Sequence, residues 1–228
     1  MWYLSLAISL YCLVPIIIPI VKNLTLFRYA IIGCFMTGWI PSMLLFARLI
    51  IGDNTILDSI STIYGYTYFS SNIAYVGLFL TGSYLIKERN RTKKFRKVLP
   101  IAYLMIVVIS IGTTYYLSIM RGEVYYRLFD YVRPNICIEA ICIFGAVTAC
   151  DFDEFNKTLC QVIIKISGMT LGIYLIHPLI LDIIKKLGLK IIGINSIFSI
   201  MVLGMITFVL SVLITFLLKK IPLVNKIC

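Results

Sequence analysis

Long apolar runs recur along this chain of 228 residues and restrict its fold more than any other feature. A helix that crosses the hydrocarbon core of a bilayer needs about 20 mostly apolar residues, because lipid offers no hydrogen bonds to the backbone. Hydrophobic residues make up 61% of the chain and charged residues only 14%, which is far from the composition of a water-soluble domain. The sequence therefore predicts an integral membrane protein.

Seven such runs, separated by short polar breaks, predict an all-α integral membrane fold, a bundle of about seven transmembrane helices. The fifth and sixth runs are the shortest and contain ionisable residues, so a five-helix chain with two re-entrant segments stays open as an alternative. The predicted spans are residues 2–21, 29–51, 66–86, 98–119, 134–150, 169–185 and 197–218.

The distribution of charge orients the predicted bundle. The net charge is +11, and the densest basic run is residues 87–97. Cytoplasmic loops carry an excess of Lys and Arg, so we place this loop and the C-terminus in the cytoplasm and the loop with Asp53 and Asp58 outside. The same pattern accounts for the basic charge without nucleic acid, and no nucleic-acid partner is predicted.

This orientation puts Met1 outside, although the first span has neither a basic flank nor a cleavable signal pattern. An odd number of helices before Met1 would remove this difficulty. We therefore expect further helices upstream of the sequence.

Two other segments have a simple physical interpretation. Residues 155–166 are amphipathic, with Phe155, Leu159 and Ile166 on one helical face, so this segment is expected to lie along the inner membrane surface. The seven cysteines are scattered, without a CxxC pair, and are interpreted as small hydrophobic residues. No metal site is predicted, since no ligand spacing suggests one.

Three stretches carry a family resemblance. Residues 167–180 read SGMTLGIYLIHPLI, residues 1–4 read MWYL before Leu10, Tyr11 and Pro15, and residues 79–85 read FLTGSYL ahead of the basic run. In this order and spacing they resemble the C-terminal two thirds of the acyltransferase 3 family of membrane acyltransferases. The resemblance covers nearly the whole chain.

The resemblance implies that residues 1–228 are the C-terminal portion of an enzyme with about ten membrane helices. Such an enzyme moves an acyl group, usually acetyl, from a cytoplasmic donor such as acetyl-CoA to a hydroxyl of a cell-surface sugar or polysaccharide. The acyl-CoA is a donor substrate, and no bound cofactor is implied. The expected partners are membrane lipid and the sugar acceptor, and the expected location is a bacterial cell membrane that the chain crosses several times.

The catalytic signature of the family has no match here. That signature is a basic residue followed some ten positions later by a histidine near the first helix, whereas His177 is the sole histidine of this chain. We therefore expect a truncated enzyme, inactive alone, with its catalytic residues upstream of Met1. A polysaccharide export or assembly subunit without catalytic activity stays open as an alternative, although the sequence shows neither the repeats nor the paired broken helices of a transporter.

Ionisable groups inside membrane spans cost at least about 2.5 kcal/mol near the bilayer centre, so each is a candidate site residue. His177 lies in the sixth span with Tyr174 one turn away on the same face. It either lines the acyl-transfer cavity or bonds a neighbouring helix at the Pro178 kink. We take His177 and Tyr174 as candidate substrate-binding residues.

The fifth span supplies the other two candidate substrate-binding residues, Glu139 and Arg133. Glu139 either positions an acceptor hydroxyl or neutralises Arg48 or Arg133, because buried charges in lipid pair with one another. Two loops also keep two interpretations. Residues 121–131 are suited either to a sugar-binding surface or to a belt of aromatic residues at the membrane interface. The basic charge of residues 87–97 either binds the phosphates of CoA or is only the positive charge expected of a cytoplasmic loop.

Overall fold

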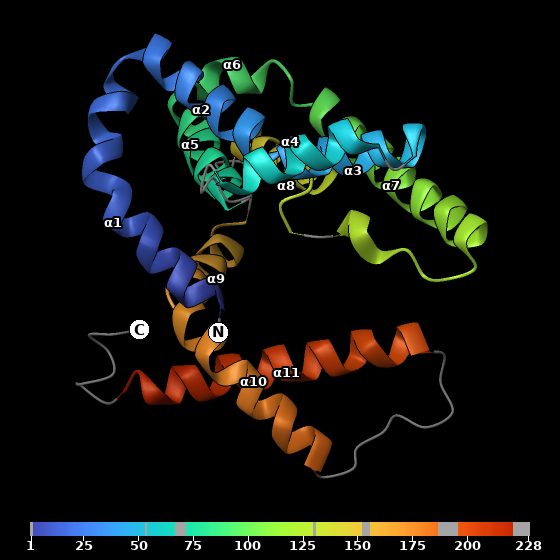
Figure 1. Cartoon of the computed structure of the whole chain (residues 1–228). Helices are drawn as coiled ribbons and strands as arrows, with labels where there is room; N and C mark the ends of the chain where they lie inside the picture. Colours follow the sequence, from blue (N-terminus) through green and yellow to red (C-terminus); the bar gives the residue numbers. More distant parts are fainter. Residues whose placement is uncertain are drawn as a thin grey trace. The chain divides into compact units, whose positions relative to one another are not determined.

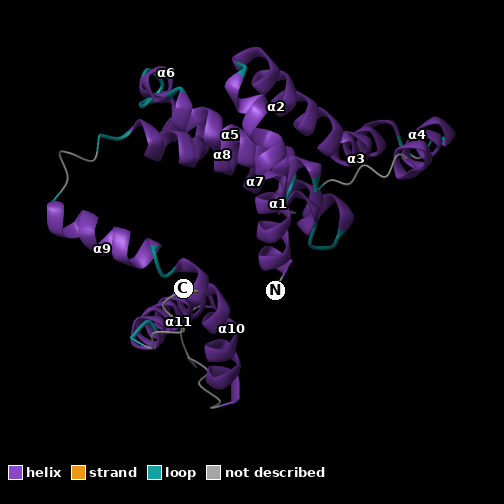
Figure 2. Cartoon of the chain, turned by 90° about the vertical axis from the view of Figure 1, so that its left-hand side faces the viewer, coloured by secondary structure: helices purple, strands orange, loops and turns teal. Residues whose placement is uncertain are grey.

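The computed structural model describes residues 2–52, 54–66, 72–129, 131–151, 156–186 and 196–220. Among these residues every element is a helix and none is a strand (Figures 1 and 2). The chain divides into two compact units, Met1–Cys150 and Asp151–Cys228. The first unit contains α1 (Trp2–Lys22), α2 (Leu24–Gly38), α3 (Ile40–Ile51), α4 (Thr55–Tyr66), α5 (Ile73–Lys87), α6 (Arg89–Lys93), α7 (Val98–Arg121), η1 (Tyr126–Phe129) and α8 (Pro134–Ala149).

Helix α5 is central to the first unit, where it packs against α1, α2 and α8, while α7 packs on α8. Two buried clusters mark these contacts. They consist of Ile17, Phe27 and Leu80, and of Phe35, Ala74 and Cys137. Because lipid is as apolar as these side chains, the close fit between helices stabilises the unit, rather than removal of apolar surface from water.

Gly38 lies where the backbone of α2 approaches α5. A Cβ at Gly38 would lie 2.8 Å from both the Cβ and the backbone nitrogen of Ala74, which is fully buried. We expect Gly38→Ala to push the helices apart and to lower the free energy of unfolding by about 1–3 kcal/mol. Thermal unfolding in detergent measures this. Gly33→Ala in the same helix is the control, since its Cβ would meet nothing within 4 Å; equal loss in both variants would contradict the close approach.

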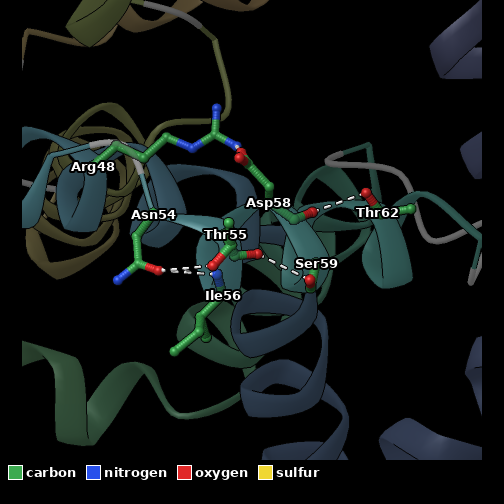
Figure 3. Close-up of polar contacts among 7 residues, drawn as sticks. All are labelled: Arg48, Asn54, Thr55, Ile56, Asp58, Ser59 and Thr62. Atoms are coloured by element: carbon green, nitrogen blue, oxygen red, sulfur yellow. Dashed lines mark hydrogen bonds and ion pairs between the residues drawn. The ribbon is translucent and has the colours of Figure 1, made fainter.

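Helices α3 and α4 pack against each other, and the residues at their facing ends explain where each one stops or starts. Gly52 ends α3 with φ of 83°, a conformation that glycine adopts without strain. Asn54 then caps α4, its side-chain oxygen accepting a hydrogen bond from the backbone N–H of Ile56 at 3.0 Å (Figure 3). The segment that we predicted to connect two spans outside the membrane is helical over Thr55–Tyr66, and its side of the membrane stays a prediction. Asp53 lies outside the described residues.

A side-chain contact ties α4 back to α2. The hydroxyl of Tyr64 donates to the backbone carbonyl of Thr37 at 3.2 Å. Burial raises the pKa of Tyr64, so the hydroxyl keeps its proton and remains a donor. Leu57 is buried on this helix. Helix α4 therefore packs against other helices of the first unit.

Among the described residues, three helices are long and apolar enough to cross a membrane, namely α1 from Leu4, α7, and α11 from Phe198. Two bent pairs each pass the same test as one broken span: α2 with α3, at 41°, and α9 with α10, at 67°. The structure thus supports three to five spans and does not confirm seven. The shortfall lies in α5 and α8, whose 15 and 16 residues extend only about 22–24 Å against a hydrocarbon core of about 30 Å.

The second unit contains α9 (Lys157–Ser167), α10 (Thr170–Lys186) and α11 (Ser196–Leu218). The amphipathic helix predicted near residues 155–166 is present as α9, whereas Phe155 lies outside the described residues. Helices α10 and α11 pack together, and a row of small hydroxyl residues is buried on α11, each bonded to the carbonyl four residues earlier. The row consists of Thr207, Ser211 and Thr215.

Part of the basic run 87–97 folds as α6, and two of its cations hold helix ends. Lys87 Nζ donates to the carbonyl of Val21 at 2.6 Å, at the end of α1. Arg89 donates to the carbonyls of Thr148 and Cys150 at 3.0 and 2.8 Å, at the end of α8. Cations are favourable at helix C-termini because unsatisfied carbonyls gather there. The side chains of Lys94, Arg96 and Lys97 are exposed.

Candidate functional site

A polar network crosses from α7 to α8 in the first unit and contains Glu139. The hydroxyl of Ser110 donates to Oε1 of Glu139 at 3.1 Å and accepts from Nδ2 of Asn135 at 3.0 Å. Asn135 also donates to the carbonyl of Leu128 in η1 at 3.1 Å. Ser110 is only 5% exposed, and Glu139 is half-buried. The serine hydroxyl therefore fixes one oxygen of the carboxylate.

Local sequence explains why this network forms. Asn135 and Glu139 are four residues apart on α8 and so project from the same face toward one serine on α7. Pro134 starts α8 and holds Arg133 in extended backbone, with φ −68° and ψ 148°. A carboxylate that receives one hydrogen bond from serine can still accept another from a hydroxyl of a bound molecule.

Arg133 lies beside this network but contacts a different helix. Its Nη1 donates to the hydroxyl of Ser42 on α3 at 3.0 Å, and Ser42 is buried. The arginine thus links α3 to the start of α8. A guanidinium carries five N–H donors, and this chemistry suits an anion or a sugar hydroxyl as a ligand.

Arg48 has a partner that we did not predict. Its Nη2 lies 2.6 Å from Oδ1 of Asp58 on α4, so the ion pair joins α3 to α4 (Figure 3). We considered Arg48 as a partner of Glu139, and the structure gives it a different carboxylate. Asp58 is 62% exposed, so this pair contributes little to stability, about 0–1 kcal/mol.

His177 lies on α10, in the second unit, immediately before Pro178. Its Nδ1 is 2.6 Å from the carbonyl oxygen of Tyr174, three residues earlier. In a regular helix that carbonyl would accept from the N–H of residue 178, but proline has no N–H. The imidazole therefore replaces the hydrogen bond that Pro178 removes. This contact lies within α10, and a bond to a neighbouring helix was one of the two roles predicted for His177.

The contact with Tyr174 also determines the tautomer of His177. A carbonyl oxygen only accepts hydrogen bonds, so Nδ1 must carry the hydrogen, and in the neutral ring Nε2 carries the lone pair. The rings of Tyr174 and His177 lie in contact at a centroid distance of 5.3 Å, with their planes tilted by 46°. The two residues are neighbours on one face of α10, as predicted.

An apolar cleft of about 420 Å³ runs along α5 and α8 in the first unit. Leu78 and Gly82 line it from α5 and Phe144 from α8, and it extends to Leu85 and Ile86, just before the basic run. Its lining is almost wholly apolar, as expected for a surface that takes an acyl chain or a lipid tail.

In the loop after α7, one of the tyrosines is turned inward. Tyr125 is buried beneath Arg121, whose guanidinium carbon lies 4.9 Å from the ring centroid, whereas Tyr126 and Tyr131 are exposed. The exposed rings of Tyr126, Phe129 and Tyr131 are placed to contact a sugar or a membrane interface.

A family model described as an acyltransferase domain, Acyl_transf_3, matches residues 1–218 of this chain. The chain belongs to the acyltransferase 3 family. The resemblance inferred from the sequence is confirmed. No curated protein and no solved structure matches the chain.

Within this acyltransferase 3 chain, the candidate residues fall into two pairs. Arg133 and Glu139 lie on or next to α8 in the first unit, and Tyr174 and His177 lie on α10 in the second. The partners Ser42, Ser110 and Asn135 were not predicted. Serine is common on apolar helices, so its presence did not point to a site. Asn135 could have been predicted as a neighbour of Glu139, because residues four apart lie on the same face of a helix.

Proposed function

We propose that this chain is part of a membrane O-acyltransferase that moves an acetyl group from acetyl-CoA, or a similar acyl-CoA, to a hydroxyl of a cell-envelope sugar or polysaccharide. The observation that carries the proposal is the family match over residues 1–218. The apolar helices support it, because an acceptor outside the membrane and a donor inside require a protein that crosses the bilayer.

The proposed reaction is a single acyl transfer. The acceptor hydroxyl oxygen attacks the thioester carbonyl, the carbon–sulfur bond breaks, CoA leaves as the thiol, and the hydroxyl proton passes to a general base. In this proposal Glu139, oriented by Ser110, accepts a hydrogen bond from the acceptor, and Arg133 binds another of its oxygens. In the second unit, His177 and Tyr174 are kept as candidate substrate-binding residues.

In this proposal the general base is the histidine of the family's catalytic signature, which has no match in residues 1–228, and His177 is held by a contact within its own helix. Expressed alone in cells that lack the gene, the chain is therefore expected to leave sugar acetylation at background. A positioned base commonly contributes about 10²–10⁴-fold. Acetylation by the chain alone that disappears in His177→Ala would contradict this and assign the base to His177.

The proposed topology puts the loop 87–97 in the cytoplasm, where acyl-CoA is found. Helix α7 links this loop to the segment that begins at Gly122, so the two lie on opposite sides of the membrane if α7 spans it. The C-terminal residues 221–228, which we predict to be cytoplasmic, lie outside the described residues.

Cysteine labelling tests this orientation. Arg96 and Glu123 are both exposed and flank α7, so they form a matched pair. With the native cysteines replaced by alanine, a membrane-impermeant maleimide should label Glu123→Cys in intact cells and Arg96→Cys only after permeabilisation. The reverse order would invert the topology and would move the donor side away from residues 87–97.

The function itself is tested by removing the coding sequence from the host chromosome. We expect base-labile acetyl esters per envelope sugar to fall to background while the amount of surface sugar is unchanged. Restoring the complete gene at its own locus should restore the esters. Less surface sugar with an unchanged number of esters per sugar would instead indicate an export or assembly subunit.

A further inference from the structure

The second unit has an open cleft of about 560 Å³ between the end of α9, the turn after it and the end of α11. Its walls are apolar and include Ile166, Met169 and Phe216. Three lysines also line it, Lys165 from α9 and Lys219 and Lys220 from the end of α11, and no acidic residue does so within the described part of the chain. The cleft therefore combines apolar walls with a purely positive charge.

The lysines are held by contacts within the unit. Lys219 Nζ donates to the carbonyl of Gly168 at 2.7 Å, which joins the end of α11 to the turn between α9 and α10. Lys220 Nζ lies 5.7 Å from the ring centroid of Phe216, a cation–π distance. These two contacts hold the side chains of Lys219 and Lys220 at the edge of the cleft. Lys165 is exposed on the polar face of α9.

The position of the cleft along α11 indicates the depth of its ligand. Helix α11 is apolar through Leu218, and the two lysines follow at once, so they lie where a spanning helix reaches the headgroup region. The neighbouring α9 is amphipathic and leaves apolar side chains uncovered, Ile164 being 70% exposed and Leu159 51%. A helix of this kind lies in the membrane interface.

We propose that this cleft binds an anionic phospholipid, with its phosphate and headgroup at Lys165, Lys219 and Lys220 and the start of its acyl chains against Ile166, Met169 and Phe216. Basic pockets at the membrane surface bind such headgroups, because phosphate is drawn to clustered lysines where water is partly excluded. The bound lipid would join α9 to the base of α11. The proposal concerns lipid recognition and does not depend on the reaction proposed above.

Native mass spectrometry of the purified full chain tests the proposal, with phosphatidylglycerol and phosphatidylcholine offered in equal amounts from mixed micelles. We expect phosphatidylglycerol to be retained in preference. The site variant is Lys165→Gln with Lys220→Gln, which leaves the structural contact of Lys219 intact. Each lysine near a lipid surface is worth about fivefold in affinity, so the double variant should bind phosphatidylglycerol about 30-fold more weakly.

The matched control is Lys185→Gln with Lys186→Gln, which removes the same charge from exposed positions at the end of α10. It should retain phosphatidylglycerol like the unchanged chain. Equal binding of both lipids, or equal loss in both double variants, would overturn the proposal. Displacement of phosphatidylglycerol by inorganic phosphate or by CoA at micromolar concentration would also overturn it, and would identify a soluble anion or the acyl donor as the ligand.

Discussion

Replacing Glu139 by alanine is expected to lower acyl transfer by about 10- to 150-fold in cells where the codon is edited at its own chromosomal locus. A hydrogen bond to a charged group contributes about 1.5–3 kcal/mol, and each 1.36 kcal/mol corresponds to tenfold in rate. Glu139→Gln keeps the shape and an acceptor for Ser110 but removes the charge, and should also lose at least tenfold. Acetyl esters per sugar at matched protein abundance measure both losses.

Asp58→Asn is the control for Glu139→Gln, because it makes the same carboxyl-to-amide change in an exposed ion pair with Arg48. We expect less than about twofold change, as exposed ion pairs contribute about 0–1 kcal/mol. Ser110→Ala should give an intermediate loss, since the carboxylate remains but loses the hydroxyl that orients it. If Glu139→Gln lowered protein abundance but left activity per molecule intact, Glu139 would be structural only.

The second prediction concerns His177, where the order of three variants should be asparagine above glutamine above alanine. The amide nitrogen of asparagine occupies the place of Nδ1 and can donate to the Tyr174 carbonyl, whereas that of glutamine matches Nε2. Asparagine should therefore keep most activity, glutamine should lose nearer tenfold than a thousandfold, and alanine should do worst. A loss beyond about a thousandfold for glutamine, with folding intact, would make His177 an acid–base catalyst.

Pro178→Ala provides a rescue experiment for the same contact. Alanine at 178 supplies the backbone N–H that proline lacks, so the Tyr174 carbonyl regains its usual donor. His177→Ala should then cost about 1–3 kcal/mol of unfolding free energy in the unchanged chain and much less beside Pro178→Ala. Additive costs in thermal unfolding would show that the imidazole does not replace the missing hydrogen bond.

Where apolar residues are continuous, the sequence predicted the helices closely. Residues 98–119 were predicted as a span, and α7 runs from Val98 to Arg121. Helix α4 was missed because its apolar residues alternate with polar ones, yet Asn54 is a helix cap and Ile56, Ile60 and Ile63 recur at helical spacing. That pattern was a sufficient signal. The number of spans was harder to predict, because it depends on α5 and α8, whose 15 and 16 residues fall short of the about 20 that a spanning helix needs.

The partners of the site residues were less predictable than the residues themselves. Arg48 pairs with Asp58, and Glu139 binds Ser110, because the helix arrangement decides which side chains meet. Local spacing does not contain that information. The contact of His177 is different. Pro178 has no backbone N–H to donate to the carbonyl of Tyr174, four residues earlier, and the side chain of His177 is close enough to donate instead. This contact was predictable from the five consecutive residues 174–178.

The most direct test of the account is the transfer of radiolabelled acetyl from acetyl-CoA to envelope sugar in sealed membrane vesicles from host cells. Inside-out vesicles expose the proposed donor side, the loop 87–97. We predict base-labile label on sugar in these vesicles, no label in right-side-out vesicles until they are permeabilised, and none in either when the gene is deleted. Equal labelling with and without the gene would contradict the account.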